Sequence, residues 1–309
     1  MRTLITGGTG FVGKALLEAS LTTESLGEIT VAARNRPRYL PPGVSFVQWN
    51  LLETTALIPN FDLVIHAATP AIIDLSNQQH TYENSLLTMT NLIKFVEQHK
   101  RPPRILFTSS GAVYGDRIGA ASHIEETWDH VVNSSSVTLY GRGKFLAEEM
   151  LRNACQAGKC DSIIARLFTF SGRFLPLDQH FAIGNFVGQA ALDKRITVRS
   201  DGRSVRSYLD SADMASWLIT AALKGTSDLP LHIGSERSTT IAELATLVAE
   251  IAGKRFNQEI QVEILGQESA IDGVRTYVPS TKLTRQALSV RETVGLERSI
   301  MDMFESSTN

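Results

Sequence analysis

The sequence is poor in cysteine and has no long apolar run, and each scarcity excludes a class of protein. Its 309 residues include two cysteines, Cys155 and Cys160, which are too few for a disulfide framework. No group of His, Cys, Asp or Glu has metal-ligand spacing, so we expect no metal site. No stretch approaches the roughly eighteen consecutive apolar residues that a membrane span requires.

An excess of charge of one sign is missing as well. The formal net charge of -2 gives no electrostatic reason to expect a nucleic acid or a membrane surface as partner. With 43% hydrophobic and 20% charged residues, the chain is too apolar for disorder. It opens directly on a strand-like run at residues 2–6, without the basic and apolar segments of a secretory signal. We therefore expect a soluble, cytoplasmic protein with two free thiols.

The first half of the chain alternates short apolar runs with longer helical patterns. This order predicts an α/β fold, in which a parallel sheet is flanked by helices. The expected strands are residues 3–6, 29–33, 45–49, 63–67, 104–109 and 162–167. The expected helices are residues 10–20, 82–99 and 140–157.

The regular alternation stops after Gly172, where an arginine-rich stretch begins. A helix is expected at 211–223, a short strand at 231–233 and a further helix at 241–252. Thr239 and Thr240 precede this last helix and Glu243 lies in its first turn, which predicts a capping box. We expect a smaller second domain built from this part of the chain.

A glycine-rich segment follows the first strand and opens the first helix. Gly7, Gly8, Gly10 and Gly13 satisfy both G-x-G-x-x-G and G-x-x-G-x-x-G. Such glycines allow a tight turn and let the backbone approach a pyrophosphate at the helix N-terminus. The placement between strand and helix predicts a dinucleotide site.

The end of the second expected strand bears on which dinucleotide is bound. A ribose 2′-hydroxyl is usually bound by an acidic side chain here, whereas a 2′-phosphate is bound by arginine. The chain has Arg34 and Arg36 and no acid at this place. Guanidinium groups match phosphate, which favours NADP(H) over NAD(H), with solvated loop arginines as the alternative.

Further motifs extend this pattern along the chain. They are TGGTGFVG at 6–13, Asn50-Leu51 after the third strand, VIHAA at 64–68 and Asn84 in the next helix. With them the chain resembles the extended short-chain dehydrogenase/reductases, a family of nucleotide-sugar epimerases, dehydratases and reductases. The resemblance implies a Rossmann-type doubly wound parallel sheet with a smaller C-terminal α/β substrate domain. It also implies dinucleotide contacts from Gly7, Gly10, Phe11, Val12, Gly13, Arg34, Arg36, Asn50, Leu51, Ala67, Ala68, Asn84, Tyr140 and Lys144.

The segments TSSGAVYG at 108–115 and YGRGK at 140–144 resemble the catalytic motifs of this family. The resemblance implies that Ser110 holds the reacting oxygen and that Tyr140 and Lys144 form the Tyr-x-x-x-Lys pair. A spacing of four places the pair on one helix face. Free tyrosine has a pKa of about 10, and a neighbouring ammonium together with an oxidised nicotinamide is expected to lower it.

One departure from the family pattern narrows the reaction. The family's 4,6-dehydratases carry an Asp-Glu pair directly after the hydroxyl residue, and this chain has Gly111 and Ala112 there. Elimination requires an acid and a base at this place, so a dehydratase is disfavoured.

The resemblance also indicates a nucleotide-diphosphate site in the second half. Arg206 and Arg275 match the family's two diphosphate-contacting arginines, and Asn185 matches an asparagine near the diphosphate. His180 is interpreted as a pocket-lining or helix-capping histidine. On this basis residues 1–170 form the dinucleotide-binding domain, residues 171–309 mostly form the substrate domain, and a segment near 210–235 returns to the first sheet.

The expected activity is reduction, with NADPH, of a nucleotide-linked 4-keto-6-deoxyhexose at C4. The alternative is a 4-epimerase that retains NAD, and a rival of another class is a non-catalytic dinucleotide-binding sensor. The resemblance further implies a homodimer formed through the helices near 82–99 and 140–157.

Overall fold

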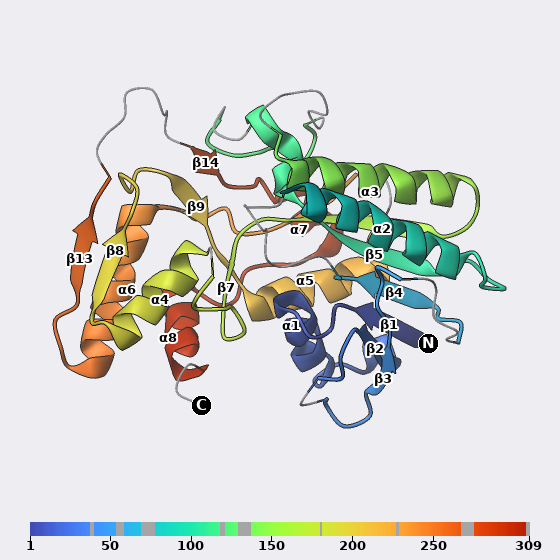
Figure 1. Cartoon of the computed structure of the whole chain (residues 1–309), viewed down its shortest axis with the longest axis horizontal. Helices are drawn as coiled ribbons and strands as arrows, with labels where there is room; N and C mark the ends of the chain where they lie inside the picture. The colour runs from blue at the N-terminus through green and yellow to red at the C-terminus, as the bar shows by residue number, and fades with distance from the viewer. Residues whose placement is uncertain are drawn as a thin grey trace.

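A seven-stranded parallel sheet is formed by six strands from the first 167 residues of the chain and one from a later segment (Figure 1). The computed structural model describes residues 1–37, 40–53, 59–68, 78–117, 121–128, 137–179, 181–226, 229–266 and 275–306. In spatial order the strands are β11 (Leu231–Ile233), β6 (Asp161–Leu167), β5 (Arg104–Ser110), β4 (Leu63–His66), β1 (Arg2–Thr6), β2 (Glu28–Ala33) and β3 (Ser45–Gln48). The strand order reverses direction at β1, which places a ligand crevice at the carboxyl ends of the strands beside it.

Helices cover both faces of this sheet, as the near-continuous apolar strands require. On one face α1 (Phe11–Ser20) packs beside α5 (Ser211–Lys224) over a core that includes Leu16, Ile65 and Trp217. On the other face α2 (Gln78–Val96) packs along α3 (Leu139–Gln156) over a core that includes Phe95 and Leu151. The Rossmann-type α/β fold is confirmed.

The expected elements of the first half are confirmed with small differences at their ends. The helix expected at 82–99 begins earlier, at Gln78, and ends earlier, at Val96. The strand expected at 63–67 ends at His66, and the N–H of Ala67 still donates to the carbonyl of Thr6 over 3.2 Å. Such shifts arise because apolar periodicity locates an element more precisely than it locates its ends.

The second half forms its own apolar core. This core lies between α4 (Ala182–Leu192), α6 (Ile241–Phe256), α8 (Leu296–Ser306) and the parallel pair β8 (Arg195–Val198) and β13 (Gln261–Ile264). Our reading of the sequence missed α4, α8 and the β8–β13 pair. The helix expected at 241–252 is confirmed as α6 and continues to Phe256, and its capping box is confirmed between Thr240 and Glu243.

Short pairings connect the two cores. They are β7 (Phe170–Ser171) with β10 (Leu209–Asp210), and β9 (Val205–Ser207) between β12 (Ser238–Thr240) and β14 (Thr276–Tyr277). After β14 the chain enters α7 (Lys282–Leu288). Within the described residues, no helix is long and apolar enough to cross a membrane.

Candidate active site

Three glycines shape the loop between β1 and α1. Gly7 has a φ of 73°, and a Cβ at this position would stand 2.6 Å from the carbonyl oxygen of Ala67. A Cβ on Gly13 would stand 2.3 Å from the carbonyl oxygen of Gly7. Helix α1 begins after Gly10, which offers no side-chain cap to the N–H groups of the first turn, including those of Phe11 and Val12. A bare backbone at an uncapped helix N-terminus fits the pyrophosphate of a dinucleotide.

Arg34 and Arg36 leave the carboxyl end of β2 next to this loop, since the N–H of Gly7 donates to the carbonyl of Ala32 over 3.1 Å. Both arginines are exposed, and the Arg36 guanidinium lies 5.6 Å from the ring centroid of Phe46. In a Rossmann site the 2′-substituent of the ribose lies at the end of this strand. Both arginines therefore lie where the sequence predicts a contact with that substituent.

Asn50 follows β3 and engages its own loop. Its side-chain amide donates to Glu53 over 2.8 Å, and its side-chain oxygen accepts from the N–H of Leu52 over 3.2 Å. The side chain of Leu51 is buried in the core. Sequence reasoning missed Asn91 on α2, whose amide donates to the carbonyls of Leu51 and Glu53 over 2.9 and 2.7 Å. Asn91 therefore holds the loop that carries Asn50.

Ala67 and Ala68 follow β4 and pack directly against the glycine loop, because Gly7 approaches both of them. Asn84 lies in the second turn of α2 and is buried, with its amide nitrogen 3.4 Å from Nε2 of His80. Ala67 and Ala68 thus lie at the carboxyl ends of β1 and β4, at the crevice that the strand order predicts.

Ser110 ends β5 and is buried at the base of the crevice. Its hydroxyl oxygen accepts the N–H of Ala112 over 3.2 Å, and the hydroxyl lowers the pKa of the nearby Tyr140 phenol. Position 111 has no room for a side chain: an added Cβ would stand 2.6 Å from the hydroxyl of Tyr277. The packing around position 111 therefore leaves no space for the first residue of the acidic pair that dehydratases carry after the hydroxyl residue.

Tyr140 and Lys144 lie one turn apart near the N-terminus of α3, whose first turn is capped by Thr138. Burial raises the pKa of Tyr140, and the contact with Ser110 lowers it in part. Lys144 is buried, donates to the carbonyl of Thr108 over 2.7 Å and lies 4.8 Å from the ring centroid of Phe107. Burial lowers the pKa of Lys144 to about 7, against the opposing effect of Glu148. A buried phenol that stays protonated at neutral pH is suited to donate a proton.

Sequence reasoning also missed a buried ion pair behind these residues. Glu148 on α3 binds Arg166 of β6 over 2.7 Å and accepts from the hydroxyl of Ser109 over 2.5 Å. Although burial raises it, the pKa of Glu148 is held below its ordinary value by Arg166 and Ser109. Arg166 also donates to the phenol of Tyr114 over 2.8 Å. The network fixes α3 to the sheet about two turns after Tyr140, and the buried charges of Glu148 and Arg166 are paired.

Two of the three predicted diphosphate contacts come together across the β9–β14 pair. Arg206 of β9 donates to the carbonyl of Arg275 over 2.9 Å, and Tyr277 is its partner in the strand register. Burial lowers the pKa of Arg206, and the neighbouring charge of Arg275 lowers it further. Two neighbouring arginines offer the charge and the donors that an anion such as a diphosphate requires.

The other residues of the substrate region lie outside this pair. Asn185, partly buried, is in the first turns of α4, where its N–H donates to Phe181 over 2.9 Å. His180 lies outside the described residues. The exposed Arg195 pairs with Glu263 over 3.5 Å, and Arg203 pairs with Asp201 over 2.8 Å, as expected of solvated arginines.

Comparison with known proteins points to one family. The model of the NAD dependent epimerase/dehydratase family matches residues 3–234. UDP-glucuronic acid decarboxylase 3 of Arabidopsis thaliana is 27% identical to the chain over 313 residues, which cover 99% of this chain and 88% of the relative.

Solved structures show the same fold. UDP-glucuronic acid 4-epimerase from Bacillus cereus, in complex with UDP-glucuronic acid and NAD, superposes with a TM-score of 0.82 at 18% identity, over 100% of this chain and 99% of that chain. RMD from Pseudomonas aeruginosa, complexed with NADPH, superposes with a TM-score of 0.79 at 23% identity, over 99% and 98% of the two chains.

Proposed function

The chain belongs to the NAD dependent epimerase/dehydratase family, and we propose that it transfers a hydride at C4 of a nucleotide-diphosphate sugar. One arrangement carries the proposal. Ser110 at the end of β5 lowers the pKa of the nearby Tyr140, and the Tyr277 ring, which lies against Gly111, is 5.9 Å from the guanidinium of Arg206 beside Arg275. A diphosphate bound by the arginines would place its sugar toward the two hydroxyls.

The residues divide the chemistry as follows. When bound, the nicotinamide dinucleotide supplies or accepts the hydride. In the direction of reduction, Tyr140 donates the proton that the sugar oxygen takes up, and Ser110 donates a hydrogen bond to the same oxygen. Lys144 holds the nicotinamide ribose and, with the dinucleotide in place, lowers the pKa of Tyr140.

We further propose that the net reaction is reduction of a 4-keto-6-deoxyhexose with NADPH. Arg34 and Arg36 at the end of β2 favour this choice, since no acid stands there to bind a 2′-hydroxyl. A reductase must also exchange its dinucleotide at each turnover, whereas a redox-neutral enzyme retains it.

A redox-neutral 4-epimerase is the second candidate. The likeness to proteins named for UDP-glucuronic acid favours it, together with the NAD named in one structure of this fold. Tyr140 would then take the proton of the C4 hydroxyl during oxidation and return it to the same oxygen during reduction, while Ser110 would hydrogen-bond this oxygen and the hydride would return to the opposite face of the sugar.

The experiment that separates the candidates begins with the dinucleotide that accompanies the purified protein. A reductase should be purified without bound NAD and should bind NADPH more tightly than NADH. On addition of a nucleotide-linked 4-keto sugar it should oxidise NADPH, with loss of absorbance at about 340 nm. An epimerase should carry tightly bound NAD and interconvert 4-hydroxyl epimers of a UDP-sugar without net oxidation. If neither assay shows turnover with sugars linked to uridine or thymidine diphosphate, the proposed hydride transfer is contradicted and a non-catalytic dinucleotide sensor is favoured.

We propose that the protein acts as a homodimer through α2 and α3. These helices pack side by side over the sheet, and Leu87 of α2 is 42% exposed on the outside. Light scattering should give the mass of two chains, and Leu87→Glu should reduce it toward that of one chain.

A further inference from the structure

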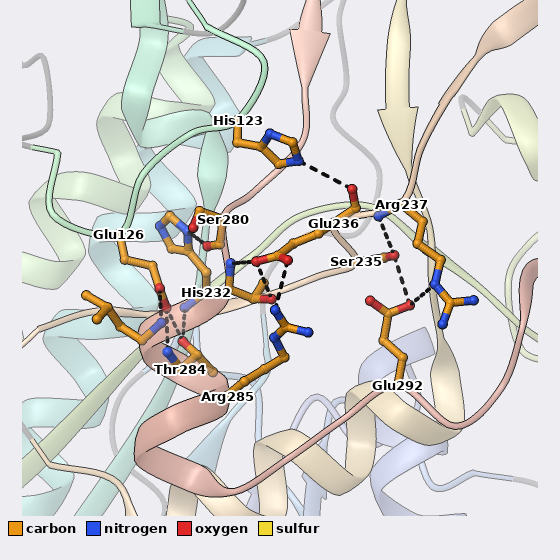
Figure 2. A network of polar contacts seen from close by, with 12 residues as sticks. His123, Glu126, His232, Ser235, Glu236, Arg237, Ser280, Thr284, Arg285 and Glu292 are labelled. Carbon is orange, nitrogen blue, oxygen red and sulfur yellow. Dashed lines mark hydrogen bonds and ion pairs between the residues drawn. The ribbon is translucent and has the colours of Figure 1, made fainter.

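A buried carboxylate, that of Glu126, holds residues 275–284, which we name the anchored stretch. Its oxygens accept three hydrogen bonds from the first turn of α7. The N–H of Leu283 donates over 2.6 Å, and the N–H and the hydroxyl of Thr284 donate over 2.7 and 2.5 Å (Figure 2). Glu126 is 4% exposed and Thr284 is fully buried, so water does not replace these bonds when they are lost. Sequence reasoning missed Glu126, because Leu283 lies 157 residues farther along the chain.

Both oxygens of Glu126 are engaged as acceptors. Oε2 binds the N–H of Leu283, and Oε1 binds the two donors of Thr284. An ionised carboxylate accepts at each oxygen and donates at neither, which suits three donors. Burial raises the pKa of Glu126, and the hydrogen bonds from Thr284 and Leu283 oppose this effect. A glutamine in its place has one accepting oxygen, and its amide nitrogen meets an N–H that needs an acceptor.

His232 of β11 binds the same stretch from the sheet. Its N–H donates to the hydroxyl of Thr284 over 2.8 Å, and its Nδ1 lies 2.9 Å from the carbonyl oxygen of Ser280. Because a carbonyl oxygen only accepts, Nδ1 carries the proton of the neutral ring. Nε2 then accepts from the phenol of Tyr114 over 2.6 Å. The Thr284 hydroxyl therefore accepts from the sheet and donates to Glu126.

Residues 124–126 form a second line of contact with the anchored stretch. Val278 accepts the N–H of Ile124 over 2.8 Å, and the N–H of Ser280 donates to the carbonyl of Ile124 over 2.8 Å. Two residues farther on, Glu126 binds the first turn of α7. One short segment thus holds the stretch at its middle and at its end.

Glu236 is a weaker anchor of the same stretch. It accepts the N–H of Thr281 over 2.6 Å, but its side chain is 30% exposed and pairs with Arg285 over 2.9 Å. Water is able to replace bonds at such a place, so their loss costs less than the loss of the buried bonds of Glu126.

The other end of the anchored stretch lies at the proposed diphosphate site. The carbonyl of Arg275 accepts from the side chain of Arg206 over 2.9 Å, and the Tyr277 ring centroid lies 5.9 Å from that guanidinium. The Tyr277 hydroxyl fills the space beside Gly111, where an added Cβ would stand 2.6 Å from it. A shift of the stretch would therefore move Arg275 relative to Arg206.

We propose that Glu126 is a positioning residue: by binding the first turn of α7, it keeps the anchored stretch where Arg275 is able to bind the diphosphate of a nucleotide sugar. The ligand in this statement rests on the proposed function, whereas the held position of the stretch belongs to the protein alone. A displacement of about 1 Å at a binding group is enough to lose much of its contribution.

Asp213 of α5 provides a matched control within the chain. Its carboxylate is also 4% exposed, and it accepts the N–H groups of Thr293 and Val294 over 2.7 and 2.9 Å and the hydroxyl of Thr293 over 2.6 Å. The set of donors is the same as at Glu126, but these donors precede α8 and lie outside the anchored stretch. Each carboxylate loses one of its two accepting atoms when it is replaced by the amide.

Glu126→Gln should raise the dissociation constant of UDP by about tenfold or more, and those of NADPH and NADH should change by less than about twofold. Asp213→Asn should leave the affinity for UDP unchanged. Isothermal titration gives the constants, and thermal unfolding measures the stability that each variant loses. An unchanged UDP affinity in Glu126→Gln, or an equal loss in both variants, overturns the proposal.

Thr284 offers a second route if Glu126→Gln does not fold. Thr284→Val removes the hydroxyl that joins His232 to Glu126 and should weaken UDP binding by about threefold or more. Thr284→Ser keeps the hydroxyl and should retain the affinity of the unaltered protein. Equal UDP affinities in the two variants also overturn the proposal.

Hydrogen exchange of the anchored stretch separates this proposal from the proposed function, because it requires no ligand. Its amides should exchange about tenfold or more faster in Glu126→Gln and at the ordinary rate in Asp213→Asn. If the unaltered protein does not bind UDP but the exchange responds in this way, the diphosphate site is wrong and the role of Glu126 in holding the stretch stands. If UDP binds and neither its affinity nor the exchange responds to Glu126→Gln, the proposed function stands and the role of Glu126 is wrong.

Discussion

Gly13 approaches Gly7 so closely that a Cβ on Gly13 would stand 2.3 Å from the Gly7 carbonyl oxygen and 2.4 Å from the Cα of Gly8. The contact joins the first turn of α1 to the end of β1, and it gives the loop the shape on which the proposed pyrophosphate site depends. No side chain fits between the two segments.

Gly13→Ala should therefore open this loop and weaken the binding of NADPH and of NADH by about tenfold or more. Fluorescence titration of the purified variant measures the two dissociation constants. The matched control is Gly295→Ala, since nothing lies within 4 Å of a Cβ at that position. Equal affinities in the two variants would contradict a dinucleotide site at this loop.

Tyr140→Phe should reduce kcat by about 10²–10⁴-fold, because it removes the group proposed to move the proton. Dinucleotide affinity should change little, since the ring and its packing remain. Tyr82→Phe on α2 serves as the control and should keep full turnover. Retention of full turnover in Tyr140→Phe would show that the proton comes from elsewhere.

Arg34→Gln and Arg36→Gln should each weaken NADPH binding by about tenfold or more and leave NADH binding nearly unchanged, because a 2′-phosphate loses a charge-assisted hydrogen bond. Calorimetric titration with both dinucleotides gives the ratio. Arg298→Gln, at an exposed arginine of α8 that pairs with Asp302 over 2.7 Å, is the control. If both dinucleotides respond alike, the two arginines do not select between them.

Arg206→Gln should raise the dissociation constant of UDP by about tenfold or more, since a half-buried guanidinium beside Arg275 is proposed to bind the diphosphate. Isothermal titration at two salt concentrations should show a weaker salt dependence than in the unaltered protein. Arg195→Gln, at an exposed arginine paired with Glu263, should bind UDP normally.

Acid should destabilise the protein through two buried histidines. Burial lowers the pKa of His66 and of His232 to about 3 from an ordinary 6.5. Between these values the unfolded chain binds protons that the native chain does not, so the free energy of unfolding falls as the pH drops from about 6.5 toward 3. At pH 5 each histidine should contribute a loss of about 2 kcal/mol.

His66→Asn isolates one of these contributions. Asparagine keeps an acceptor for the hydroxyl of Thr6, which lies 2.8 Å from Nδ1 of His66, and it does not titrate. Urea unfolding between pH 7 and pH 4.5 should show a shallower loss of stability in the variant than in the unaltered protein. Parallel curves would mean that His66 is protonated in the native state as readily as in the unfolded one.

Several polar contacts were not predictable because their partners are far apart in the chain. Asn91 holds the loop at Leu51 from another element, and Glu148 finds Arg166 only when α3 lies on the sheet. Each of these side chains is an ordinary helix or strand residue in its own segment. Each bonds its distant partner because packing removes the side chain from water, and the sequence of one segment does not show this.

The sequence by itself determined the features that involve neighbouring residues. The glycines between β1 and α1 act within one turn, and Tyr140 and Lys144 share a face of α3 because a helix repeats about every 3.6 residues. The alternation of apolar runs and helical patterns was likewise enough for the Rossmann-type sheet. Only the tertiary structure decided that Tyr277 of β14 fills the space left by Gly111, next to the end of β5, because this depends on how distant strands pack and leaves no periodic trace in the chain.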